Sequence, residues 1–172
     1  PYVIAGGFPK DHVDAYSLSR EAQKIVIDRL PNIGLALTMD VDAIHDLHFT
    51  NKQIVGARMA QWALSEVYNR PVPYKGPVYK NMKARGNTIR IRFNNAGKGL
   101  STSDGKYPAH FTVAGEDGIF HPAEARIDGR VVVLESKEVS KPKNARFAWS
   151  DAAVVNLVNS DGLPTSLFRT DQ

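Results

Sequence analysis

The fold is decided by residues 33–53, IGLALTMDVDAIHDLHFTNKQ. Residues 33–39 are apolar without alternation, which is typical of a strand buried on both faces of a parallel sheet. A helical pattern with a capping-box start, Thr50 followed by Gln53, then runs to about residue 68. The acidic, histidine-containing segment between them is therefore predicted to be a strand-to-helix loop, where ligands bind in α/β folds.

This loop contains the groups of a general base and its orienting acid. His48 is the candidate base, and Asp40, Asp42 and Asp46 lie upstream of it. An alternative interpretation is a polar loop whose aspartates cap the following helix. Together with His45 these side chains could also ligate a metal, but no second cluster accompanies them, and we expect no metal. A glycine-rich phosphate loop is absent, so we expect no cofactor.

The first 70 residues predict two βα units. Residues 2–7 read as a short strand and residues 17–29 as a helix, and the strand at 33–39 and the helix at 50–68 follow. Each helix has a predicted packing face, formed by Leu18, Ala22, Ile25 and Arg29 in the first and by Val55, Met59, Trp62, Ala63 and Val67 in the second. Two such units expose strand edges and bury little core, so further polypeptide is expected to complete the sheet.

The rest of the chain predicts an all-β region. Residues 71–87 are rich in proline near their start and read as a linker. Strands are then predicted at residues 88–93, 111–115, 123–127, 130–134 and 145–149, with Asp-Gly turns at 104–105, 117–118, 128–129 and 161–162. Short strands at this spacing indicate an antiparallel β-sandwich.

The bulk composition is that of an ordinary globular protein. The 172 residues carry a net charge of +4, contain no cysteine and are 42% hydrophobic. No apolar run approaches the length of a membrane span, so we expect no membrane partner. Basic residues are scattered apart from one cluster, at Lys80, Lys83, Arg85, Arg90 and Arg92, so we expect no nucleic-acid partner. Because the chain starts at Pro1 without a methionine, we expect a processed chain or a fragment.

Residues 46–56 (DLHFTNKQIVG), followed by residues 60–64 (AQWAL), resemble the Asp-Ile-His-Pro-x-Asn-Lys segment of the sialate O-acetylesterase family. Its members are carbohydrate esterases with an SGNH-hydrolase domain. Further similar stretches follow the family's order: 20–23 (REAQ), 38–40 (TMD), 74–79 (YKGPVY), 114–118 (AGEDG), 122–123 (PA), 146–149 (RFAW), 156–157 (NL), 162–164 (GLP) and 168–171 (FRTD). The resemblance therefore covers nearly the whole chain.

The resemblance implies an architecture that is α/β plus all-β. Residues 1–70 would be the last two βα units of a flavodoxin-like, three-layer SGNH domain, and residues 71–172 would be the linker, an accessory antiparallel β-sandwich and a C-terminal tail. It also implies a secreted, periplasmic or lysosomal location.

The resemblance implies hydrolysis of O-acetyl esters on sialic acids, with His48 as the general base for a serine nucleophile. The family's serine and oxyanion donors have no match here. They are expected in an N-terminal part of the same precursor or in a second chain, and this chain alone would then be inactive. Two alternatives stay open: an SGNH acetylesterase for other acetylated glycans, and a non-catalytic carbohydrate-binding or scaffolding module.

The acidic partner of His48 is ambiguous by this resemblance. SGNH enzymes have an aspartate three residues before the histidine, and that position is His45 here. Asp46 is the first choice because it is near in sequence, and Asp40 is the second because it ends the predicted strand. A Ser/His dyad held by a backbone carbonyl is the third. Phe49 replaces the family's usual proline.

Overall fold

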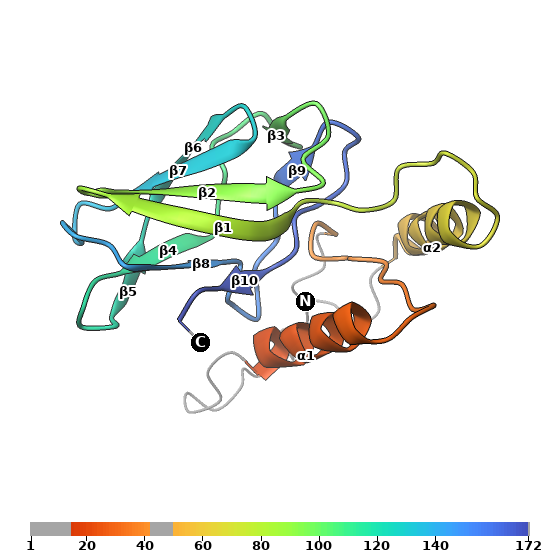
Figure 1. Ribbon diagram of the computed structural model, residues 1–172, viewed down its shortest axis with the longest axis horizontal. Coiled ribbons are helices and arrows are strands. Elements are labelled where there is room, and N and C mark those ends of the chain that lie inside the picture. Colours follow the sequence, from red (N-terminus) through yellow and green to blue (C-terminus); the bar gives the residue numbers. More distant parts are fainter. Residues whose placement is uncertain (1–14, 42–49, 172) are drawn as a thin grey trace. The chain divides into compact units, whose positions relative to one another are not determined.

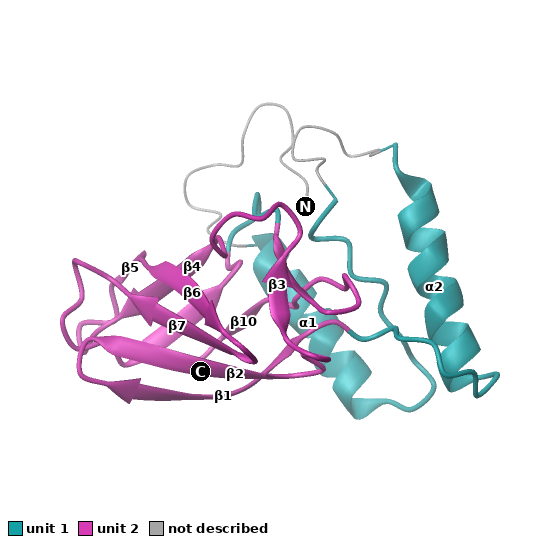
Figure 2. Cartoon of the chain, turned by 90° about the horizontal axis from the view of Figure 1, so that it is seen from above, with its two compact units in different colours: residues 1–75, 150–154 teal, residues 76–149, 155–172 magenta. Residues whose placement is uncertain are grey.

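The computed structural model describes residues 15–41 and 50–171 (Figure 1). The chain divides into two compact units (Figure 2). Unit 1 contains residues 1–75 and 150–154, and unit 2 contains residues 76–149 and 155–172. The boundary after residue 75 lies close to the predicted change of architecture. The return of residues 150–154 to unit 1 had no signal in the sequence.

Both described helices of unit 1 lie where the sequence predicts them. They are α1 (Ala15–Arg29) and α2 (Lys52–Glu66). The cap of α2 differs from the prediction, because Asn51 rather than Thr50 occupies the N-cap, and its side chain accepts a hydrogen bond from the Ile54 N–H at 3.4 Å. Beyond the helix, Asn69 adopts a left-handed conformation with φ 52° and the Arg70 N–H donates to the Leu64 carbonyl at 2.8 Å. The helix thus ends at Glu66, and the left-handed Asn69 lies between this end and Pro71.

The strand predicted at residues 33–39 is wrong for the described part of the chain. Residues 33–38 have no strand pairing there, and residues 39–40 form a turn. A strand requires the backbone of a neighbour to bond its N–H and C=O groups, and the strand predicted at residues 2–7 lies outside the described residues. The segment packs against α2 instead, since Gly34 lies so close to the indole ring of Trp62 that a Cβ at this position would clash with it.

The predicted packing faces of the two helices are largely exposed. On α1, Ser17 is buried, whereas Leu18 and Ile25 are 49% and 41% exposed. On α2, Met59 and Val67 are 61% and 56% exposed. The reason is that the described residues of unit 1 contain no sheet for these faces to cover. Unit 1 therefore leaves much of its apolar surface in contact with solvent.

The more covered face of α1 contacts residues 150–154, which belong to the same unit. The Tyr16 N–H donates to the Asp151 carboxylate at 2.9 Å, and the Arg20 guanidinium donates to the carbonyls of Ser150 and Asp151 at 3.1 and 3.4 Å. Burial lowers the pKa of Arg20, and the charge of Asp151 opposes that change. These bonds attach residues 150–154 to the start of α1.

Unit 2 is built from antiparallel strands, as the sequence predicts. Its first four-stranded sheet has the order β1 (Val78–Arg85), β2 (Thr88–Asn94), β7 (Val131–Glu135) and β6 (Glu124–Asp128). Its second has the order β10 (Phe168–Arg169), β8 (Asn144–Phe147), β4 (Phe111–Ala114) and β5 (Phe120–Pro122). A smaller sheet pairs β3 (Leu100–Thr102) with β9 (Leu157–Asn159).

One strand of the first sheet lies where the sequence predicts a linker. Strand β1 occupies most of the second half of residues 71–87 and pairs with β2, with Met82 opposite Ile91. Its sequence, VYKNMKAR, shows little apolar alternation because β1 is an edge strand with mostly exposed residues. The Asp-Gly turns are confirmed: Gly105, Gly118, Gly129 and Gly162 all have positive φ.

The core of unit 2 lies between the inner faces of the two larger sheets. Ile89, Ile91 and Leu134 of the first sheet are fully buried, as is Phe147 of the second. Full burial of such a side chain contributes about 1.5–3 kcal/mol to stability. Phe168 of the second sheet contacts two aromatic side chains of the first sheet. Its ring stacks on that of Tyr79, with 4.7 Å between the ring centres, and lies edge-on to that of Phe93, with 6.0 Å between the ring centres.

The last described residues are attached to the second sheet by an ion pair. Arg146 donates to both carboxylate oxygens of Asp171, at 3.1 and 2.5 Å, and its guanidinium lies 3.9 Å from the centre of the Phe120 ring. The Ala145 N–H donates to the Thr170 hydroxyl at 2.9 Å. The hydrogen bond from Arg146 lowers the pKa of Asp171.

This ion pair predicts acid sensitivity. Because the pKa of Asp171 is lower in the folded state, its stabilising effect is present above the ordinary carboxyl pKa of 3.8 and is lost as the pH falls through the lower folded value. We expect Asp171→Asn to reduce the thermal midpoint at neutral pH and to flatten its decline on acidification, measured by calorimetry between about pH 6 and pH 2. Asp161→Asn, on an exposed turn, is the control. An unchanged acid profile for Asp171→Asn would contradict the assignment.

Candidate active site

Of the acidic and histidine residues predicted for the site, the structure describes Asp40. The other four, Asp42, His45, Asp46 and His48, lie outside the described residues. The described part of the site therefore consists of residues 37–41, which precede the segment 42–49, and residues 50–58, which follow it.

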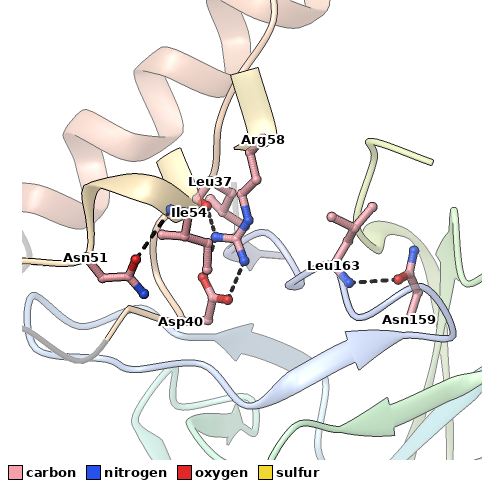
Figure 3. Close-up of polar contacts among 7 residues, drawn as sticks. All are labelled: Leu37, Asp40, Asn51, Ile54, Arg58, Asn159 and Leu163. Atoms are coloured by element: carbon pink, nitrogen blue, oxygen red, sulfur yellow. Dashed lines mark hydrogen bonds and ion pairs between the residues drawn. The ribbon is translucent and has the colours of Figure 1, made fainter. Parts of the chain in front are cut away.

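Arg58 of α2 joins the two flanks (Figure 3). Its two terminal nitrogens donate to the two carboxylate oxygens of Asp40, at 2.7 and 2.5 Å. The Arg58 guanidinium also donates to the Leu37 carbonyl. Because the side chains of Arg58 and Asp40 are only 9% and 14% exposed, this is a largely buried, two-pronged ion pair.

The helix period explains why Arg58 reaches this position. Arg58 is four residues after Ile54 and four before Trp62, so the three side chains lie on one face of α2. Trp62 covers Gly34 on that face, and Arg58 extends to the turn in which the Val41 N–H donates to the Thr38 carbonyl at 3.2 Å. The face of α2 that contacts residues 34–40 therefore includes a charged side chain, which an apolar stripe cannot reveal.

The pair fixes the polypeptide just before the segment that carries His48. Two buried charges compensate each other, and the additional bond to Leu37 uses a further guanidinium hydrogen. The bonds from Arg58 therefore hold Asp40 and the turn at residues 38–41 in place. Arg58 was missed by sequence reasoning, which counted it among the scattered basic residues. The spacing of Arg58 from Ile54 and Trp62 places it on their face of α2, but this spacing does not point to Asp40 as its partner.

A second ordered polar group, within unit 2, is centred on Asn156. Its side-chain oxygen accepts from the Ala109 N–H, and its amide donates to the Asp104 carboxylate and the Tyr107 carbonyl, each at 3.0 Å. Bonds from the Lys106 N–H and from Asn156 lower the pKa of Asp104. These contacts order the loop 103–109, on which Tyr107 is 81% exposed.

Asn159, three residues further on, organises a turn of unit 2 (Figure 3). Its side-chain oxygen accepts from the N–H groups of Asp161 and Leu163, both at 3.0 Å, and its amide donates to the Asn95 carbonyl at 3.0 Å. Asn159 is 2% exposed. We assign it a structural role, because its polar atoms serve the backbone.

The described residues supply few other candidates for chemistry. Within residues 15–41 and 50–171, no three His, Asp or Glu side chains are grouped closely enough to hold a metal ion. His121 pairs with Glu138 at 2.9 Å on the surface, and among the hydrogen bonds of the described part none joins a serine hydroxyl to a histidine. None of the described helices is long and apolar enough to cross a membrane.

The fold of this chain is similar to part of a solved structure, whereas the sequence comparisons give no match. Neither a family model nor a curated protein sequence matches the chain. Among solved structures, it is similar to a carbohydrate acetylesterase from Xanthomonas citri, with 36% sequence identity and a TM-score of 0.89. The alignment covers 99% of this chain and 40% of that esterase. The chain thus spans about two fifths of the esterase's length and shares the fold of that part.

Proposed function

We propose that this chain is part of a carbohydrate esterase that removes O-acetyl groups from glycans. The similarity to the Xanthomonas citri carbohydrate acetylesterase, at 36% identity over 99% of this chain, carries the proposal. The resemblance of residues 46–56 to the sialate O-acetylesterase segment agrees with it and suggests acetylated sialic acids as the substrate. An acetylesterase for other acetylated glycans is the alternative within the same chemistry.

In the proposed reaction His48 is the general base. Its imidazole takes the proton of a serine hydroxyl as that oxygen attacks the acetyl carbonyl, and it returns the proton to the departing sugar oxygen. The acetyl-serine is then hydrolysed by water, which His48 activates in the same way. Acetate and the deacetylated glycan are the products.

Asp46 is the proposed orienting acid, with Asp40 as the alternative. The contacts of Asp40 favour this order, because both of its carboxylate oxygens already accept hydrogen bonds from Arg58. A carboxylate in that arrangement has less capacity to hold an imidazole N–H. Arg58 would then act on the site indirectly, by fixing the turn that leads into the segment with His48.

The serine nucleophile is proposed to lie on other polypeptide, either an N-terminal part of the same precursor or a second chain. The exposed helices of unit 1 support this proposal. Among the described residues, ten of the twelve exposed large hydrophobic side chains belong to unit 1. Apolar surface gathered in this way is typical of a face that contacts other protein.

The proposal predicts that the 172-residue chain alone is inactive. With p-nitrophenyl acetate as substrate, we expect its turnover to equal that of a His48→Ala variant of the same chain, because the sequence contains no nucleophile motif for His48 to activate. Turnover clearly above that control would show that a serine of this chain serves as the nucleophile, and would contradict the proposed division of the site.

Adding the nucleophile-bearing polypeptide tests the function itself. We expect acetate release from an O-acetylated sialic acid to appear only with both parts present. Release from acetylated xylan but not from the sialic acid would move the substrate to other acetylated glycans. Binding of both glycans with no release from either would favour the non-catalytic module.

A further inference from the structure

The outer face of the sheet β1-β2-β7-β6 carries an excess of positive charge. Directly opposed residues of neighbouring strands share a face of the sheet, so the register defines rows across it. One row contains Lys83, Arg90, Val133 and Arg126, the next contains Asn81, Arg92, Val131 and Asp128, and the third contains Arg85, Thr88, Glu135 and Glu124. The opposite face of the sheet contributes Ile89, Ile91 and Leu134 to the core.

The carboxylates of this face are already engaged by neighbours. Asp128 pairs with Arg90 at 2.6 Å, Glu124 with Lys137 at 3.5 Å, and Glu135 accepts from the Asn87 amide at 2.5 Å.

The cations of the same face are in excess. Lys83, Arg85, Arg92 and Arg126 are exposed, and none of them has an ion-pair partner among the described residues. We call these four side chains the basic face. It lies mainly along β1 and β2, whose pairing sets the spacing of the backbone positions that carry these side chains.

We propose that the basic face binds a carboxylate-bearing glycan. This proposal rests on the proposed function, because the glycan chemistry comes from there, and it narrows the substrate class to acidic glycans. Arginine guanidinium groups donate two parallel hydrogen bonds to a carboxylate, and three of the four cations are arginines. Repeated carboxylates along a chain would meet repeated cations along two adjacent strands.

The residue types of this face favour a glycan over a nucleic acid. Proteins that bind single strands combine cations with aromatic side chains on which the bases stack. The three rows contain no aromatic residue, since Tyr79 and Phe93 point to the core side.

Binding to polygalacturonate by the whole 172-residue chain tests the proposal, with dextran as the neutral glycan and a single-stranded DNA as the nucleic acid. We expect binding to polygalacturonate that weakens with added salt. The variant Lys83→Gln/Arg92→Gln should weaken it about tenfold. Lys98→Gln/Lys106→Gln removes the same charge from exposed positions outside the face and should stay within about twofold of wild type.

Each other result overturns the proposal. The proposal fails if the chain does not bind polygalacturonate, if it binds dextran equally well, or if both double variants lose the same amount of affinity for polygalacturonate. It also fails if the chain binds the DNA more tightly than polygalacturonate and the Lys83→Gln/Arg92→Gln variant loses that DNA binding. Thermal unfolding verifies that each variant is folded, and Arg85→Gln/Arg126→Gln replaces the first pair if that pair does not fold. Since no ester bond is cleaved in this assay, its failure leaves the role of His48 untouched, and loss of catalysis leaves the binding result standing.

Discussion

Replacing His48 with alanine is expected to lower kcat of the complete esterase by about three orders of magnitude or more. Without the imidazole the serine hydroxyl loses its proton acceptor, and the departing sugar oxygen loses its proton donor. KM should change little, because a general base contributes mainly in the transition state. Steady-state kinetics on an O-acetylated sialic acid measure both constants.

Neighbouring substitutions serve as matched controls for that result. His45→Ala should cost much less, since His45 is interpreted as a loop residue. Asp46→Asn should give an intermediate loss if Asp46 orients His48, and Asp40→Asn should do so if Asp40 has that role. If kcat of the His48→Ala enzyme lies within about tenfold of the wild-type value, the catalytic assignment is refuted. That result would favour the non-catalytic carbohydrate-binding or scaffolding module.

Replacing Arg58 with methionine is expected to destabilise unit 1 by about 3–5 kcal/mol. The substitution keeps an unbranched side chain of similar length but leaves the Asp40 carboxylate, 14% exposed, without its partner. It also removes the donor to the Leu37 carbonyl. Urea unfolding followed by the fluorescence of Trp62 measures the loss, in a Trp149→Phe background so that the signal comes from unit 1.

A double variant separates the ion pair from the packing of the side chain. Asp40→Leu combined with Arg58→Met should recover much of the loss, because replacing both partners of a buried pair by apolar residues is often neutral. Arg29→Met, at the exposed end of α1, should change stability by no more than about 0.5 kcal/mol. If Arg58→Met is as mild as Arg29→Met, the Arg58–Asp40 pair does not hold the turn.

Local patterns were sufficient for the parts of the fold that depend on near neighbours. The period-two alternation of residues 88–93 predicted β2, because alternate side chains of a strand face opposite sides. Each Asp-Gly pair predicted a turn, because its glycine accepts positive φ at little cost. Both helices were found from their spacing and their terminal residues, with errors of one or two residues at the ends.

Tertiary contacts decided what these patterns could not. Residues 33–39 read as a buried strand, but strand structure depends on a partner backbone, and composition does not state whether one is present. Strand β1 reads as linker, yet pairing with β2 makes it the sheet edge. The packing faces of α1 and α2 had the right period, but their burial depends on what lies opposite.

For the candidate site, the sequence alone placed an acidic and histidine-containing segment between residues 39 and 50, and by resemblance it singled out His48. The tertiary structure showed that Asp40 is bound by Arg58, 18 residues away along the chain. No local pattern can indicate that pair, because an arginine on a helix looks the same in sequence whether it faces water or a carboxylate. The pair exists because the fold of unit 1 brings α2 against the turn at Asp40 and excludes water from both charges, so that each requires the other.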